Sequence, residues 1–243
     1  MNDENKIREV LMKHHKAVRS FGHEPVMTVL VGSQNYGLAT EKSDYDTFTF
    51  TLPRVEDIAT LKDPVSTTHE DEFGHINIKD IRLALNLLKK TSPNSVECFA
   101  SKYYIVEHEF EDLIEAARAP VLLRCDTHHM MAAIGGLAHQ LTKRNMPPGK
   151  RLSHMLRMHC MVYNYFDIKK DILSLTEEEQ KLAMKAKLNP DNLKWDDMCD
   201  EYGKYVQDAI ANVNLDYFKD IEQDAKMTIG HIQTQIVRMV LNH

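Results

Sequence analysis

Two aspartates separated by one residue, Asp44 and Asp46, are the residues of this chain whose type and spacing most clearly suggest a chemical role. They open a run that alternates with the apolar Phe48 and Phe50, and this period of two predicts a strand beginning at Asp44. Because side chains alternate along a strand, both carboxylates would share one face, about 7 Å apart at their Cα atoms. Mg²⁺ prefers hard oxygen ligands of this kind and completes its shell with water and substrate phosphates. We therefore expect Asp44 and Asp46 to bind a divalent cation.

A phosphate-binding turn is predicted shortly before the two acids. An apolar run from Met27 to Val31 predicts a short strand, and this run ends on Gly32 and Ser33. Gly32 would let the backbone approach a phosphate closely, and Ser33 would add a hydroxyl at a predicted helix start, where free N–H groups favour an anion. The sequence thus places a predicted phosphate site beside a predicted cation site.

This stretch resembles a known superfamily. An apolar strand, Gly-Ser, a spacer from Gln34 to Ser43, and then Asp-Tyr-Asp is similar to the signature of the DNA polymerase β-like nucleotidyltransferases. Tyr36-Gly37-Leu38-Ala39 within the spacer resembles the bacterial and phage branch of small predicted nucleotidyltransferases. The resemblance covers roughly residues 25–107. It implies an α+β fold, with a small mixed sheet and flanking helices followed by a helical lobe, and metal-dependent transfer of a nucleoside monophosphate from an NTP or dNTP.

Relatives usually carry a third carboxylate at the start of the last strand of the core. The pattern from Val65 to Ile78 predicts a hairpin whose second strand starts at His75, which would hold that position. An imidazole is a poor Mg²⁺ ligand but an acceptable Mn²⁺ ligand, and it could serve as a general base. Two alternatives stay open: His75 is an ordinary surface residue, or the third acid is Glu70, Asp71 or Glu72.

A cationic helix is predicted over residues 150–166, where an apolar stripe alternates with Lys150, His154 and Arg157 at helical spacing. Lys150, Leu156 and Arg157 also match a pattern in the helical region of the relatives. Because a transferring phosphoryl group needs cations opposite its metal, we expect these three basic residues to bind the triphosphate. A solvated cationic face is the ordinary explanation for Lys150 and Arg151.

The resemblance also places Glu97 at the position of a glutamate that recurs in the relatives. The alternative is that Glu97 only interacts favourably with the dipole of its own helix.

The pattern divides the chain into a nucleotidyltransferase core over residues 1–119 and a helical lobe over 120–243. Spacing in the second part predicts an apolar seam along the last helices, which could pack on the body or form a homo-oligomer. The principal helices predicted are Glu4–Ser20, Ser95–Ala100, Asp126–Arg144, Thr176–Ala186, Lys194–Asn212 and Leu215–Asn242.

Composition excludes several classes of protein. The 243 residues are 43% hydrophobic, with no apolar run of membrane-spanning length and no signal-peptide core, so the expected location is the cytoplasm. The formal net charge of -6 argues against a broadly basic surface for long duplexes. The four cysteines are far apart and form no C-x-x-C pair, so we expect reduced, mostly buried thiols.

The leading hypothesis is therefore a nucleotidyltransferase that uses Mg²⁺, with Mn²⁺ as the alternative cation. The acceptor hydroxyl could lie on a protein side chain, a nucleic-acid 3′ end or a templateless oligomer. The competing hypothesis is a catalytically degenerate nucleotide-binding regulatory protein, such as a partner in a toxin–antitoxin or phage-defence pair. His75 favours this second class, whereas the intact Asp44 and Asp46 oppose it, because two adjacent unneutralised carboxylates cost stability.

Overall fold

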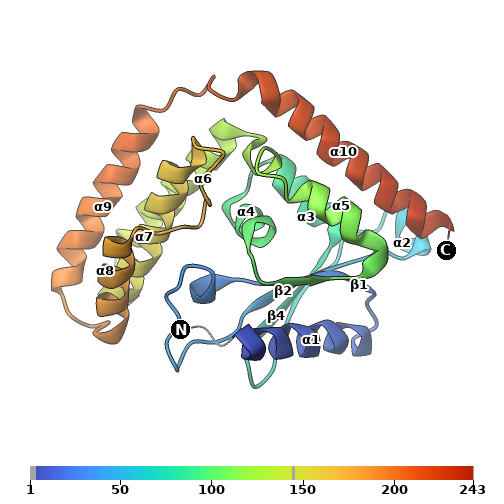
Figure 1. The fold of residues 1–243 in the computed structure, drawn as a ribbon, viewed down its shortest axis with the longest axis horizontal. Coiled ribbons are helices and arrows are strands. Elements are labelled where there is room, and N and C mark those ends of the chain that lie inside the picture. The colour runs from blue at the N-terminus through green and yellow to red at the C-terminus, as the bar shows by residue number, and fades with distance from the viewer. Residues whose placement is uncertain (1–3, 144–145, 243) are drawn as a thin grey trace.

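The structure, a computed structural model that describes residues 4–143 and 146–242, combines a five-stranded mixed sheet with a helical lobe (Figure 1). The strand order is β3-β4-β2-β1-β5, with β2 and β4 parallel and the other neighbours antiparallel. This confirms the predicted α+β class. The strands are β1 (Pro25–Leu30), β2 (Thr47–Thr51), β3 (Ser66–Glu70), β4 (His75–Asp80) and β5 (Tyr104–Val106).

Helices cover both faces of the sheet. On one side lies α1, and on the other lie α3, α4 and α5, with α10 crossing over them (Figure 1). The remaining helices α6 to α9 form the lobe beside the sheet. The helices are α1 (Glu4–Ser20), α2 (Val55–Ala59), α3 (Ile81–Lys89), α4 (Pro93–Ala100), α5 (Glu111–Ala117), α6 (Thr127–Leu141), α7 (Pro148–Tyr165), α8 (Glu177–Leu188), α9 (Lys194–Ala211) and α10 (Lys219–Asn242).

The alternation in β2 explains how the sheet is buried on both sides. Thr47 and Thr49 are buried toward α1, whereas Phe50 packs on the opposite face, where its ring stacks on Phe99 of α4 at 5.4 Å. Side chains of a strand alternate between faces, so Asp46 shares the α4 side with Phe50. The acidic end of β2 therefore faces the helical lobe.

Helix ends follow local capping chemistry. The carboxylate of Asp80 accepts a hydrogen bond from the Arg82 N–H at 2.8 Å, and Asp126 accepts one from His129 at 2.9 Å. Thr176 forms a capping box with Glu179 at the start of α8. The predicted end of α6 at Arg144 lies outside the described residues, and the observed helix ends at Leu141.

Three sequence expectations require correction or completion. β2 begins at Thr47, so Asp44 and Asp46 precede the strand instead of opening it. Ser33 lies in a three-residue 3₁₀ turn, Gly32–Gln34, and not at the start of a longer helix. The short edge strand β5 was not predicted.

The apolar seam of α10 is buried against the chain itself. Ile229, Ile232 and Ile236 are at most 5% exposed, and the helix packs on α3 and α5. The seam therefore needs no second copy to cover it. The division of the chain at residues 119 and 120 stays a prediction.

Two further features concern the chain as a whole. The described cysteines Cys98, Cys125, Cys160 and Cys199 are free and buried, which agrees with the expectation that these residues are mostly buried. In the part of the chain that the structure describes, no helix combines the length and apolar character needed to cross a bilayer.

Candidate active site

The predicted binding residues meet in one cleft of about 440 Å³ between the β1–β2 connection and the helical lobe. Asp44 and Asp46 lie on the wall formed by the β1–β2 connection, and Lys150, Arg157 and Lys187 lie on the wall formed by α7 and α8. The sequence-predicted residues that line it are Gly32, Ser33, Asp44, Asp46, Lys150, His154 and Arg157. Two segments more than a hundred residues apart in the chain thus form one site with acids opposite cations.

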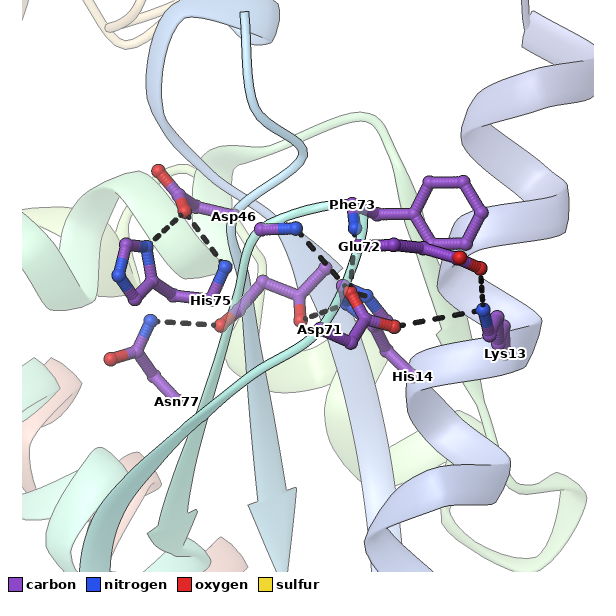
Figure 2. Close-up of polar contacts among 10 residues, drawn as sticks. Lys13, His14, Asp46, Asp71, Glu72, Phe73, His75 and Asn77 are labelled. Carbon is purple, nitrogen blue, oxygen red and sulfur yellow. Dashed lines mark hydrogen bonds and ion pairs between the residues drawn. The ribbon is translucent and has the colours of Figure 1, made fainter.

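His75 lies directly beside Asp46. Thr47 pairs with Ile76 in the parallel β2–β4 ladder, which sets the preceding residues side by side. Asp46 Oδ1 accepts hydrogen bonds from the His75 backbone N–H at 3.1 Å and from His75 Nδ1 at 2.9 Å (Figure 2). The bond to Asp46 raises the pKa of His75 above its usual value. His75 thus starts β4, as predicted, and both of its hydrogen bonds orient the carboxylate of Asp46.

Asp44 and Asp46 place two hard oxygen donors in one cleft. Among the described residues, no group of three or more His, Cys, Asp and Glu side chains is arranged to hold a metal ion. Both bonds from His75 go to Asp46 Oδ1, and Oδ2 faces Gly32, where an added Cβ would lie 4.0 Å from it. Asp44 is exposed in the same cleft. Hard oxygen donors beside an open space suit Mg²⁺, whose remaining ligands can be water and phosphate.

Glu97 holds the Gly-Ser turn. Gly32 has a φ of 81°, a conformation that favours glycine, and its N–H donates to Glu97 Oε1 at 2.6 Å. The Gly32 N–H is therefore engaged within the protein, which corrects the expectation of a helix N-terminus open to phosphate. Burial raises the pKa of Glu97, opposed by the charge of Arg157 and the Gly32 N–H. Glu97 is the fifth residue of α4, so its main contact is to this turn and not to the helix dipole.

Arg157 has unused hydrogen-bonding capacity at the centre of the cleft. Its Nε is buried without a hydrogen-bond partner in the described structure, and its guanidinium lies 4.8 Å from the centre of the Tyr36 ring. Burial, followed by the charges of Arg157, Lys150 and Lys187, lowers the pKa of His154 to about 4. His154 is thus neutral near pH 7, and the positive charge of the wall comes from its neighbours.

Lys187 is a cleft residue that the sequence pattern did not indicate. The helix predicted over 176–186 extends to Leu188, and at this end of α8 Ala183 and Ala186 are buried and Lys187 lines the cleft. Lys187 Nζ donates to the Leu38 carbonyl at 2.6 Å. Burial and the charges of Arg157 and Lys150 lower the pKa of Lys187 to about 8. Only the contact between α8 and the β1–β2 connection reveals this residue.

The lowered pKa of Lys187 predicts proton uptake on triphosphate binding. At pH 8 the free protein holds this amine about half protonated, and bound phosphates favour the ammonium form, so binding should take up as much as about half a proton. Titration calorimetry in two buffers of different ionisation enthalpy measures this number. Lys187→Ala should abolish the uptake, whereas Lys185→Ala, on the exposed side of α8, should retain it. Equal uptake in both variants would assign the proton to another group.

Arg151 belongs to the core and not to a solvated face. Its side chain is 1% exposed, Nη2 pairs with Asp196, and Nη1 donates to the Leu141 carbonyl at 3.0 Å. The packing of α7 against α9, which carries Asp196, explains the burial. Of the two cations at the start of α7, only Lys150 faces the cleft.

Glu70, Asp71 and Glu72, the other candidates for the third carboxylate, differ in the residues that they contact. Asp71 accepts hydrogen bonds from the Phe73 N–H at 2.8 Å and from His14, and Glu72 pairs with Lys13 on the α1 side (Figure 2). Glu70 is the β3 partner of His75 and therefore shares its face of the sheet. Asp71 and Glu72 thus stabilise the β3–β4 turn, whereas Glu70 is the acid on the same side as His75.

A small mixed sheet that presents paired aspartates beside a Gly-Ser turn, opposite a cationic helix, defines a polymerase β-like nucleotidyltransferase. The model of the family RlaP, described as an RNA repair pathway DNA polymerase beta family, matches residues 6–185, and the chain belongs to this family. The comparison with curated proteins gave no match. A solved structure, that of a nucleotidyltransferase-like protein from Exiguobacterium sibiricum 255-15, is similar over 96% of this chain and 80% of its own, at 10% identity and a TM-score of 0.30.

Proposed function

We propose that this chain is a divalent-metal-dependent nucleotidyltransferase that transfers a nucleoside monophosphate from an NTP or dNTP to a hydroxyl acceptor. The observation that supports this most strongly is the cleft itself, in which Asp44 and Asp46 face Lys150, Arg157 and Lys187. A polyphosphate bridging a cation to basic side chains would neutralise both walls at once.

Different residues of the chain would have different roles in an in-line displacement at the α-phosphorus. Asp44 and Asp46 would hold Mg²⁺ or Mn²⁺, which supplies charge stabilisation to the entering and leaving oxygens. Arg157 and Lys187 would bind the departing pyrophosphate, and His75 would keep Asp46 Oδ1 occupied so that Oδ2 faces the cleft. The acceptor oxygen forms a bond to the α-phosphorus, the bond to the bridging oxygen of pyrophosphate breaks, and the hydroxyl proton is released.

We propose an RNA 3′ end as the acceptor. The support is the description of the family, which names an RNA repair pathway. A protein side chain and a templateless oligomer are the other two acceptors that the same chemistry could use. Parallel reactions with RNA, with RNA blocked at its 3′ hydroxyl, and with unmodified protein separate them.

A second hollow of about 310 Å³ opens beside the cleft and shares His154 and Arg157 with it. Its walls combine apolar side chains with a few polar groups, the usual composition of a small-molecule pocket. We propose that it holds the nucleobase, with the triphosphate in the cleft. Its lining includes Tyr36, Asn94, Glu97, Leu137, Gln140 and Met158.

This assignment predicts that the chain binds an NTP more tightly than inorganic tripolyphosphate. Leu137→Trp should fill the hollow and lower NTP affinity by about tenfold or more, since contacts of a base with apolar and aromatic side chains contribute about 1–3 kcal/mol. Tripolyphosphate affinity should stay unchanged in the same variant. Leu193→Trp, at a position 73% exposed and outside the hollow, is the control.

Comparing NTP with tripolyphosphate distinguishes an error in the nucleobase assignment from an error in the proposed function. If tripolyphosphate and NTP bind with equal affinity, the base lies elsewhere although the cleft binds phosphates. If neither ligand binds in the presence of Mg²⁺ or Mn²⁺, the proposed function is wrong.

A further inference from the structure

A buried histidine on the opposite side of the sheet contacts the supports of the metal-binding residues. His14 of α1 has a side chain that is 0% exposed. Its Nδ1 lies 2.8 Å from Thr47 Oγ1, and its Nε2 lies 3.2 Å from Asp71 Oδ1 (Figure 2). Thr47 immediately follows Asp46, and Asp71 begins the turn that leads to His75. One imidazole therefore touches both segments that carry the site.

The chemistry of the partners fixes the hydrogen-bond directions. Burial lowers the pKa of His14, opposed by Asp71, so the ring is neutral near pH 7 and has a single N–H. Burial acts to raise the pKa of Asp71, but the Phe73 N–H, His14 and the Gly74 N–H lower it overall. The ionised Asp71 only accepts, so Nε2 donates to Asp71 and Nδ1 accepts from the Thr47 hydroxyl. The link is thus directional and uses both nitrogens.

Asp71 transmits this contact to the β3–β4 turn. Its Oδ1 also accepts from the N–H groups of Phe73 at 2.8 Å and Gly74 at 3.3 Å. Two lysines of α1, Lys6 and Lys13, lie over the Phe73 ring at 4.5 and 4.3 Å. The turn is therefore fixed to α1 by the carboxylates of Asp71 and Glu72 and by the Phe73 ring.

The β3–β4 turn also contacts the segment that carries Asp44 and Asp46. The Tyr45 N–H donates to the Phe73 carbonyl at 2.8 Å, between the two aspartates in sequence. Gly74 approaches so closely that a Cβ there would lie 3.1 Å from Tyr45 N and 3.2 Å from Asp44 Cβ. Asp44, Asp46 and His75 are thus all placed by a turn whose position depends on Asp71 and His14.

We propose that His14 is a positioning residue of the active site, which sets the separation of Asp44, Asp46 and His75 from the far face of the sheet. This inference rests on the proposed function, because the separation matters only if the two aspartates bind a cation. Groups that hydrogen-bond directly to metal ligands change metal affinity by about 10- to 100-fold when they are removed. His14 acts one contact further away, through Thr47 and the β3–β4 turn.

The chain provides a closely matched control. His15 is also buried on α1, with Nδ1 2.8 Å from Thr28 Oγ1 and Nε2 2.7 Å from Glu107 Oε1. It joins a threonine to a carboxylate as His14 does, but its contacts lead to β1 and to the residue after β5. Replacing either histidine removes similar buried bonds, and only one of the two serves the metal-binding residues.

The test measures the Mn²⁺ concentration that gives half of the maximal thermal stabilisation. His14→Asn reaches Thr47 but not Asp71, and we expect this concentration to rise by about tenfold or more. His14→Gln, which reaches Asp71, should recover most of the affinity, and His15→Asn should keep the wild-type value even where its melting temperature falls. Amide exchange of the Tyr45 N–H should accelerate in His14→Asn and not in His15→Asn.

The outcomes separate this inference from the proposed function. Wild-type metal affinity and Tyr45 protection in His14→Asn would overturn the inference, as would an equal loss in His15→Asn. A wild type that Mn²⁺ does not stabilise would instead refute the proposed metal site, while Tyr45 exchange would still report whether His14 fixes the turn. If His14→Asn does not fold, Asp71→Asn tests the same link from its half-buried end.

Discussion

Replacing Asp46 with asparagine is expected to reduce nucleotidyl transfer by about a thousandfold or more. A bound cation supplies several kcal/mol of charge stabilisation, and each factor of ten in rate corresponds to about 1.4 kcal/mol. Asparagine keeps an oxygen that can accept from the His75 N–H groups, so the variant should fold and lose only the negative charge. Transfer is measured with α-labelled NTP in the presence of Mg²⁺ or Mn²⁺.

Asp63→Asn is the matched control, since Asp63 is an exposed acid in the connection between α2 and β3. It should retain wild-type transfer. Transfer by Asp46→Asn at the control rate, in a protein that melts cooperatively, would remove Asp46 from the catalytic site.

Removing Arg157 is expected to weaken binding of nucleoside triphosphate by about 1–3 kcal/mol, or about 5- to 150-fold in affinity. The guanidinium lines both hollows and has a buried Nε without a partner in the described structure. A phosphate or base acceptor would satisfy this donor in the bound state. Calorimetry with Arg157→Ala measures the loss.

Arg118→Ala provides a control of the same kind. The Arg118 guanidinium also stacks on a tyrosine, 3.7 Å from the Tyr104 ring centre, and also has a buried nitrogen without a partner among the described residues. It lines neither hollow. A similar loss of affinity in both variants would indicate a general effect of losing a stacked arginine.

The local pattern was sufficient to predict the acidic wall of the site. A period of two places Phe48 and Phe50 on one face and extends that parity back to Asp46, even though the strand itself starts at Thr47. The hairpin pattern predicted that its second strand starts at His75, and β4 does start there. The parallel pairing of β4 with β2, which sets His75 beside Asp46, was not predicted. Helical spacing placed Lys150, His154 and Arg157 on one face of α7.

The residues that escaped prediction depend on contacts between distant segments. The Gly32 N–H hydrogen-bonds to Glu97, His14 to Asp71, and Lys187 to the Leu38 carbonyl, and each pair is far apart in sequence. No periodicity within a window encodes such pairs, so Lys187 had the signature of an exposed lysine. Arg151 had the same signature, and its burial follows from the packing of α7 against α9.

The most direct test of nucleotidyl transfer is to follow the α- and γ-phosphates of the donor separately with the wild-type protein. With Mg²⁺ or Mn²⁺, each NTP and dNTP is supplied with a label on the α- or the γ-phosphate, together with a single-stranded RNA that has a free 3′ hydroxyl. We expect that the α-label joins the RNA, that the γ-label appears in pyrophosphate, and that both steps are absent without metal and in Asp44→Asn/Asp46→Asn. Movement of the γ-label to the acceptor, or no movement of either label with any donor on RNA or protein, would contradict nucleotidyl transfer by this protein.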